Sequence, residues 1–234
     1  VLMNEAGRTG MEGKMAQIID GKAISQTIKD EVKQEVEALS GQGIMVTLAV
    51  IQVGDNPAST VYVNNKKKAC AYTGIRSLSY NLPGSARQEE LLALIAELNE
   101  RKDVNGILVQ LPLPAHMNED AVIEAIDPKK DVDGFHPQNV GALCIGKPGF
   151  VPCTPAGIIE LLKRSGIEIA GKECVMIGRS NIVGKPMALL LLPENGTVTV
   201  AHSRTADLKS VAGRADILVV AVGKAKMITA EYVR

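Results

Sequence analysis

Tyr62 and Lys66 stand four residues apart in a segment expected to be helical, so their side chains should share one face. A lysine beside an aromatic ring in a cleft can take up and release protons during a reaction. Ser59, three residues before Tyr62, shares that face approximately and is with Tyr62 a candidate for substrate contact. Lys66, Lys67 and Lys68 are consecutive and fan around the helix, so a solvated basic face with a packed tyrosine is the simpler alternative.

Two loops carry further polar candidates. Gln110 directly follows a buried apolar run and begins Gln-Leu-Pro-Leu-Pro, a loop made rigid by its prolines. Ligands of parallel sheets bind at the C-terminal ends of strands, which makes Gln110, Leu111 and Pro112 candidates for substrate contact. Asp133 lies in Asp-Val-Asp-Gly, where a carboxylate can pair with the amino-pyrimidine of a pterin. An ordinary turn would contain the same residues.

A glycine-bounded loop, Gly178 to Gly184, stands between an expected strand and an expected helix and contains Ser180. Glycine there lets backbone amides approach a phosphate at the positive end of the helix. The spacing departs from G-x-G-x-x-G, so a tight turn without a ligand is the alternative. Gly223, after a later strand, leaves room for a cofactor or merely turns the chain.

The next expected strand ends at His202, Ser203, Arg204 and Thr205, where dinucleotide-binding folds meet the adenosine ribose. NAD-specific sites usually place an acidic residue there. Hydroxyl donors and positive charge, with Arg179 from the glycine loop, suit a 2′-phosphate instead. The pattern therefore favours NADP over NAD as the cofactor.

The elements that must position these residues alternate between strand and helix, which predicts an α/β fold with parallel sheets. In the first part of the chain, strands are expected at 46–53, 75–82 and 104–110, and helices at 24–39, 58–72, 88–99 and 118–126. In the second part, strands are expected at 173–177, 197–202 and 216–222, and helices at 185–192 and 207–212. This second order is the first half of a dinucleotide-binding fold.

Between the two parts, residues 127–154 are rich in proline and glycine, which predicts a loop-rich passage without a long periodic segment. It should end at a helix capped by Thr154, with Pro155 at the first helical position. Residues 1–14 are polar and patternless, and we interpret them as a leader or expression scar.

Composition narrows the class of protein. The 234 residues have a formal net charge of zero, which gives no reason to expect nucleic acid or an anionic membrane as partner. No apolar run approaches the roughly 20 residues that span a bilayer. The cysteines lack metal-ligand spacing and are expected to be thiols in a reducing cytosol; they are Cys70, Cys144, Cys153 and Cys174. We expect no metal site, and His116 and His136 should be structural or surface residues.

Taken together, these segments resemble the methylenetetrahydrofolate dehydrogenase/cyclohydrolase family. The matching stretches follow the family's order: PASTVYVNNKKKA (57–69), GILVQLPLP (106–114), KKDVDGFHP (129–137), CTPAGIIELL (153–162), GRSNIVGKPMALLL (178–191) and HSRTADL (202–208). The resemblance implies two three-layer α/β domains, a folate-binding catalytic domain at 15–148 and a Rossmann-type NADP-binding domain at 149–234. It places the active site in the cleft between them.

The resemblance also implies a pair of reactions in one-carbon metabolism and purine biosynthesis, in the cytoplasm. Methylenetetrahydrofolate gives a hydride to NADP, and water opens the methenyl cation to 10-formyltetrahydrofolate. Lys66 is then the central acid/base residue and Gln110 tunes it. Tyr62 stacks on the aminobenzoyl ring and Asp133 fixes the pterin.

For the cofactor, the resemblance implies that Arg179 and Ser203 contact the 2′-phosphate, with the Gly178 loop under the pyrophosphate. It implies a homodimer paired through the cofactor domain, for which the strand edge around 197–202 is a candidate contact. Family members continue past the position of Arg234 with a further strand and a final helix, so we expect the natural protein to be longer.

Two alternatives remain open. One is a monofunctional dehydrogenase or cyclohydrolase of the same family, against which Lys66 and Gln110 argue. The other is a dinucleotide-binding sensor without catalysis. The co-occurrence of Tyr62, Lys66, Gln110 and Asp133 argues against it, because a sensor needs no such set.

Overall fold

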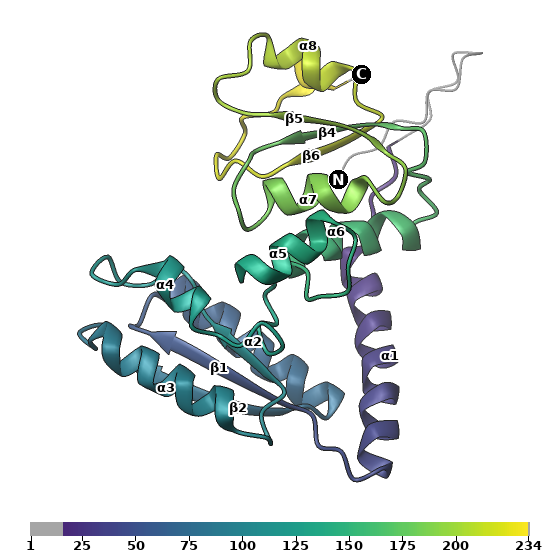
Figure 1. Ribbon diagram of the computed structural model, residues 1–234. Helices are drawn as coiled ribbons and strands as arrows, with labels where there is room; N and C mark the ends of the chain where they lie inside the picture. Colours follow the sequence, from purple (N-terminus) through teal and green to yellow (C-terminus); the bar gives the residue numbers. More distant parts are fainter. Residues whose placement is uncertain (1–15, 234) are drawn as a thin grey trace. The chain divides into compact units, whose positions relative to one another are not determined.

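The computed structural model describes residues 16–233, which divide into two compact units (Figure 1). One unit is Lys22–Gly141, and the other contains the chain from Ala142 onward. The expected leader, residues 1–14, lies outside the described residues. Within the described part of the chain, each unit is built on a three-stranded parallel sheet, which confirms the predicted fold class.

The Lys22–Gly141 unit has the order β2-β1-β3 in its sheet. The elements of this part of the chain are α1 (Gly21–Gly41), β1 (Thr47–Val53), α2 (Pro57–Thr73), β2 (Arg76–Leu82), α3 (Gln88–Glu100), β3 (Gly106–Val109), α4 (Glu119–Glu124) and α5 (Pro137–Cys144). β1 is central, and Leu48 lies opposite Gly106 of β3. The C-terminal ends of β1 and β3 are therefore neighbours, which brings Gln110 beside the end of β1.

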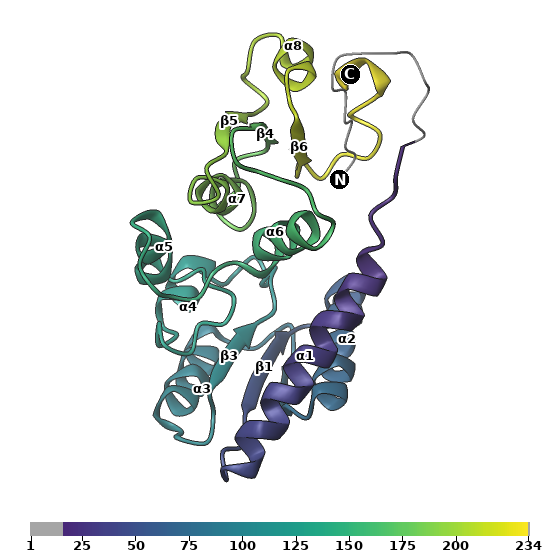
Figure 2. The ribbon, with the colours of Figure 1, turned by 90° about the vertical axis from the view of Figure 1, so that its right-hand side faces the viewer.

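Alternation along the strands divides this unit into layers, because successive side chains point to opposite faces of a sheet. Ile51 and Ile107 face one side and pack in a core with Leu91 of α3. Leu108 faces the other side and packs with Val63 of α2. Figure 2 shows α3 on one side of β1 and α1 and α2 on the other. The result is a sheet between two helical layers.

The second unit has the sheet order β5-β4-β6. Its elements are α6 (Cys153–Arg164), β4 (Glu173–Ile177), α7 (Gly184–Leu191), β5 (Thr197–Ala201), α8 (Leu208–Gly213), β6 (Ile217–Val220) and the 3-10 helix η1 (Ala230–Tyr232). Met176 of β4 packs with Leu162 and Met187 from α6 and α7. Val175, one residue earlier, faces the opposite core with Ala212 of α8. In Figure 1, α7 and α8 accordingly lie on opposite sides of this sheet.

One local prediction was wrong. Helix α6 begins at Cys153 with Pro152 as its N-cap, so Thr154 is not the cap. Pro155 is instead the third helical residue. It is tolerated there because the first N–H groups of a helix have no intrahelical acceptor. The passage predicted to be loop-rich also contains one short helix, α5. The short α5 depends on tertiary contacts, since isolated helices of this length are unstable.

Between residues 16 and 233, no helix combines the length and the apolar character required to cross a membrane.

Candidate active site

Helix α2 holds the candidate lysine in a well-defined position. The side-chain oxygen of Asn56 accepts hydrogen bonds from the backbone nitrogens of Ala58 and Ser59, at 3.0 and 3.2 Å, and caps the helix. Pro57 occupies the first helical position. Gly74 ends the helix in the left-handed region, with φ of 83°, which glycine adopts without steric cost. Both ends of the helix that carries Lys66 are therefore fixed by local chemistry.

Lys66 donates a hydrogen bond from Nζ to Oε1 of Gln110, at 3.2 Å. The orientation of Gln110 is determined by two further bonds. Its backbone N–H donates to the carbonyl of Ile51 at 2.8 Å, and its side-chain Nε2 donates to the carbonyl of Leu111 at 2.7 Å. Because the amide nitrogen is committed to Leu111, the amide oxygen points to Lys66 and accepts from it. The structure thus brings together two residues that are 44 positions apart in the sequence.

The carboxyl group of Asp133 lies within electrostatic range of Lys66. Burial raises the pKa of Asp133 above its ordinary value, and the Asp131 carboxylate adds to the shift, whereas the Lys66 ammonium opposes it. The preceding Asp131 is only 2% exposed and accepts hydrogen bonds from the His136 N–H at 2.8 Å and from Nδ2 of Asn139 at 2.9 Å. Asp131 therefore holds the loop, and Asp133 presents its carboxyl group near Lys66.

The other candidates on α2 differ in accessibility. Tyr62 is 62% exposed, so the alternative in which its ring is packed in the core is wrong. Ser59 is 5% exposed, so it does not share the accessible surface of Tyr62 as its spacing predicted. Lys68 is exposed, whereas Lys66 is partly buried, as expected for consecutive residues fanning around a helix. Ser59 lies four residues before Val63 and so shares the face of α2 that packs against the sheet.

The shifted pKa of Asp133 predicts a pH-dependent stability. A carboxyl group whose pKa is raised by folding binds more protons in the folded than in the unfolded state. Its contribution is therefore present at low pH and is lost as the pH rises from about 4 through the raised pKa. Asp133→Asn should flatten this part of the profile and be more stable than wild type at neutral pH. Urea unfolding over a pH series measures the slope, and identical slopes for the two proteins would contradict the assignment.

The glycine loop after β4 depends on close backbone packing. Gly178 has φ of 126°, and a Cβ atom there would lie 2.4 Å from the carbonyl oxygen of Ala221. A Cβ on Gly184, the first residue of α7, would lie 2.4 Å from the carbonyl oxygen of Gly178. Only glycine fits at either position. The start of the helix can then approach the end of the strand as closely as phosphate-binding loops require.

Ser180 stabilises this loop from within. Its Oγ accepts hydrogen bonds from the backbone nitrogens of Val183 and Gly184, at 3.2 and 3.3 Å. The N–H of Gly178 donates to the carbonyl of Ala201, the last residue of β5, at 2.8 Å. Arg179 follows β4, and the residues after Ala201 follow β5. Because these strands are parallel neighbours, both segments lie at the same edge of the sheet. Arg179 is exposed.

Residues 202–205 form a tight turn stabilised by its own side chains. The His202 N–H donates to Oγ1 of Thr205 at 2.8 Å, and the Thr205 N–H donates back to the His202 carbonyl at 2.9 Å. The Arg204 N–H donates to Nδ1 of His202 at 3.1 Å. His202 and Thr205 therefore shape the turn, and they leave the side chains of Ser203 and Arg204 exposed.

The donor set of this turn fits a 2′-phosphate. The first acidic residue after β5 is Asp207, and its carboxylate caps α8 by accepting from the N–H of Ser210 at 3.2 Å. An acid committed to a helix cap is poorly placed to bind a ribose hydroxyl. Gly223, the remaining cofactor candidate, follows β6 in the left-handed region with φ of 64° and is exposed.

Two of the four cysteines, Cys144 and Cys153, are exposed, and the other two have structural surroundings, as do His116 and His136. Cys70 and Cys174 are buried, and burial raises the pKa of both thiols, that of Cys174 to about 11. His116 contacts the carbonyl of Ala86, and Nδ1 of His136 accepts from the N–H of Gln138, as expected for structural residues. Across residues 16–233, no group of three or more His, Cys, Asp or Glu side chains is arranged to hold a metal ion.

Comparisons with known proteins identify the family of this chain. The family model "Tetrahydrofolate dehydrogenase/cyclohydrolase, catalytic domain" matches residues 19–133, and that for the family's NAD(P)-binding domain matches residues 152–234. The chain is 70% identical over 220 residues to the bifunctional protein FolD of Lachnoclostridium phytofermentans, covering 94% of this chain and 78% of that protein.

Solved structures give the same result. The bifunctional enzyme FolD from Campylobacter jejuni is 50% identical, with a TM-score of 0.91, over 93% of this chain and 78% of that one. The Trypanosoma brucei FolD, complexed with NADP and an inhibitor, is 39% identical, with a TM-score of 0.89, over 93% of this chain and 75% of that one.

Proposed function

This chain belongs to the tetrahydrofolate dehydrogenase/cyclohydrolase family, and from this we propose that Lys66 and Gln110 are the centre of its chemistry. The protein oxidises 5,10-methylenetetrahydrofolate with NADP to the methenyl compound and hydrolyses that product to 10-formyltetrahydrofolate. The observation that carries the residue assignment is the 3.2 Å bond from Lys66 to Gln110, beside the carboxyl group of Asp133.

The oxidation needs positioning more than acid or base strength. The methylene carbon lies between two nitrogens, which stabilise the positive charge left when hydride departs. NADP, when bound, supplies the nicotinamide ring that accepts this hydride. On the protein side, the exposed ring of Tyr62 supports a role in stacking on the aminobenzoyl group. The carboxyl group of Asp133 pairs with the pterin, and Gln110, Leu111 and Pro112 line the substrate's other edge.

The hydrolysis needs one group that moves protons. The oxygen of water attacks the methenyl carbon, and the Lys66 amine accepts the proton that water loses. The bond from that carbon to N5 then breaks as the hydroxyl of the adduct becomes the formyl oxygen. N5 receives the proton held by Lys66, and the hydroxyl proton leaves to solvent. The lysine ends as it began, and one proton is released overall as the cation becomes a neutral product. Gln110 accepts a hydrogen bond from Lys66 and so keeps Nζ of Lys66 directed at the reacting carbon. This role accounts for the commitment of the Gln110 amide nitrogen to Leu111.

We assign the cofactor contacts to the loops at the edge of the second sheet. The 2′-phosphate is bound by Arg179, Ser203 and Arg204, which are exposed at the ends of neighbouring strands. The Gly178–Gly184 loop lies under the pyrophosphate, where the crowding at both glycines supports close backbone approach. Ser180, His202 and Thr205 shape the two loops, and Gly223 leaves space beside the cofactor.

An assay with purified protein tests the function. Methylenetetrahydrofolate and NADP should give NADPH and acid-revealed methenyl product, at rates far above those with NAD. Supplied methenyltetrahydrofolate should be hydrolysed. Oxidation without hydrolysis would favour a monofunctional enzyme, and NADP binding without folate binding would favour a non-catalytic protein. Absence of both activities in intact protein would overturn the assignment.

We further propose a homodimer, a cytoplasmic location, and a contribution to purine biosynthesis through one-carbon metabolism. β5 is an edge strand of its sheet within the described residues, and Val200 on it is 40% exposed, which supports pairing through this edge. The buried thiols of Cys70 and Cys174 suit a reducing compartment. We place the folate-binding domain at 15–148 and the cofactor domain at 149–234.

A further inference from the structure

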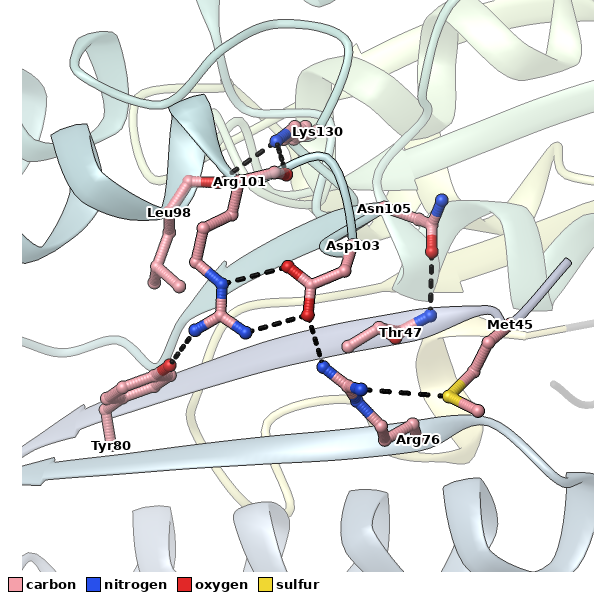
Figure 3. Close-up of polar contacts among 9 residues, drawn as sticks. All are labelled: Met45, Thr47, Arg76, Tyr80, Leu98, Arg101, Asp103, Asn105 and Lys130. Atoms are coloured by element: carbon pink, nitrogen blue, oxygen red, sulfur yellow. Dashed lines mark hydrogen bonds and ion pairs between the residues drawn. The ribbon is translucent and has the colours of Figure 1, made fainter.

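Lys130, in the loop before Asp131, binds the end of a distant helix. Its Nζ donates hydrogen bonds to the backbone carbonyls of Leu98, Asn99 and Arg101, at 3.0, 2.6 and 2.7 Å. Figure 3 shows the bonds to Leu98 and Arg101. The last carbonyls of a helix have no intrahelical partner, and a positive charge is favourable there. Helix α3 has no basic residue in its own last turn, so Lys130 supplies that charge from about 30 residues away along the chain.

The backbone of the same residue binds the sheet. The carbonyl of Lys130 accepts a hydrogen bond from the Ile107 N–H at 2.7 Å, and Asp131 forms an isolated parallel bridge with Ile107. Ile107 belongs to β3, the strand that leads to Gln110. Asn99 adds a second tie to the same segment: its Oδ1 accepts from the Asp127 N–H at 2.9 Å. The loop is thus fixed to α3 by a side chain and to β3 by its backbone.

This double attachment determines where the loop that carries Asp133 begins. Asp133 lies three residues after Lys130, and the intervening Asp131 is buried and fully engaged by His136 and Asn139. A change in the position of Lys130 would therefore be passed along a short, constrained segment to the carboxyl group near Lys66. We propose that Lys130 is a positioning residue of the folate site, which sets the Asp133 carboxyl group against Lys66. This proposal rests on the function and site proposed above.

A neighbouring cluster provides a matched control. The Arg101 side chain donates to Asp103 at 3.0 and 2.9 Å and to the Tyr80 hydroxyl at 3.0 Å (Figure 3). Arg76 bonds the same carboxylate at 2.5 Å. These bonds stabilise the same end of α3, and none of them involves the Asp131–Asp133 loop. Replacing the Arg101 side chain leaves its backbone carbonyl available to Lys130.

The test is a double-mutant cycle in the whole protein. Lys130→Met is expected to lower kcat/KM for methylenetetrahydrofolate by about 10- to 100-fold, mainly through KM, because a misplaced substrate contact is lost or weakened. KM for NADP should stay unchanged. Arg101→Met should lower the urea midpoint without changing KM for the folate. A Lys130→Met protein with unchanged folate KM would overturn the proposal.

Combination with Asp133→Ala decides whether the lysine acts through the aspartate. If it does, the double variant binds folate no worse than Asp133→Ala alone, because coupled residues are not additive. Fully additive losses would overturn the proposal and leave the site assignment intact. An Asp133→Ala protein with normal folate kinetics would instead overturn the site assignment itself. Should Lys130→Met not fold, the same cycle is run with Lys130→Arg, which keeps the charge but cannot direct three donors at the same carbonyls.

Discussion

Replacement of Lys66 by methionine is expected to reduce the hydrolysis of methenyltetrahydrofolate by at least about 100-fold, the lower bound of what a positioned acid/base group contributes. Methionine is apolar and of similar length, so α2 should remain folded. The substitution removes the amine that bonds Oε1 of Gln110 and that moves protons in the proposed mechanism. Oxidation should suffer less, since it depends on positioning of the substrate more than on proton transfer.

The measurement follows the loss of the methenyl absorbance after mixing with enzyme, and NADPH formation in a separate assay. Lys67→Met is the matched control, because the next residue of an α-helix is turned by about 100° from Lys66. That variant should retain both activities. Equal losses in the Lys66 and Lys67 variants, or full hydrolysis without Lys66, would remove the lysine from the mechanism.

Replacement of Ser203 by aspartate is expected to lower kcat/KM with NADP by about 100-fold, the equivalent of losing a hydrogen bond to a charged group and adding repulsion. Ser203 is exposed in the turn held by His202 and Thr205, so the new carboxylate should not disturb the turn itself. It would face the 2′-phosphate with like charge. It would also restore the acid that NAD-binding sites use for the ribose hydroxyl.

Parallel assays with NADP and NAD give the ratio of specificities for the variant. Ser203→Ala separates the lost hydrogen bond from the added repulsion, because it removes the hydroxyl without adding charge. Its kcat/KM with NADP should fall by about 10-fold. KM for the folate should be unchanged in both variants. A Ser203→Asp protein that still prefers NADP as strongly as wild type would place the 2′-phosphate elsewhere.

The main elements of this fold could be predicted from the sequence because the signals that specify them are local. The run 46–53 is continuously apolar, and it forms the central strand β1. Asn56 and Pro57 begin α2 and Gly74 ends it through caps that involve only neighbouring residues. The loop at Gly178 could be predicted for the same reason, because a glycine directly after a predicted strand indicates a place where a side chain would not fit.

The sequence pattern also predicted the chemical types of the proposed site: a lysine on a helix face, an amide and a carboxylate in loops after strands, and hydroxyl and cationic groups in the turn proposed to contact the cofactor's ribose. Spacing within one element decided which of these could share a face. It was wrong for Ser59, which is buried although its spacing from Tyr62 suits a common face. Ser59 also shares a face with Val63, and periodicity alone does not say which of the two faces the sheet covers.

What only the tertiary structure decided are the relations between distant segments. The Lys66–Gln110 bond joins positions 44 residues apart, and Lys130 reaches the carbonyls of α3 from about 30 residues away. Burial raises the pKa of Asp133, and the Lys66 ammonium on the distant helix α2 opposes that shift. The short helix α5 lies within the passage that the sequence predicted to be loop-rich. Such contacts form when the chain closes long loops and buries apolar strands together. A local sequence pattern does not indicate which polar groups this closure brings within hydrogen-bonding distance.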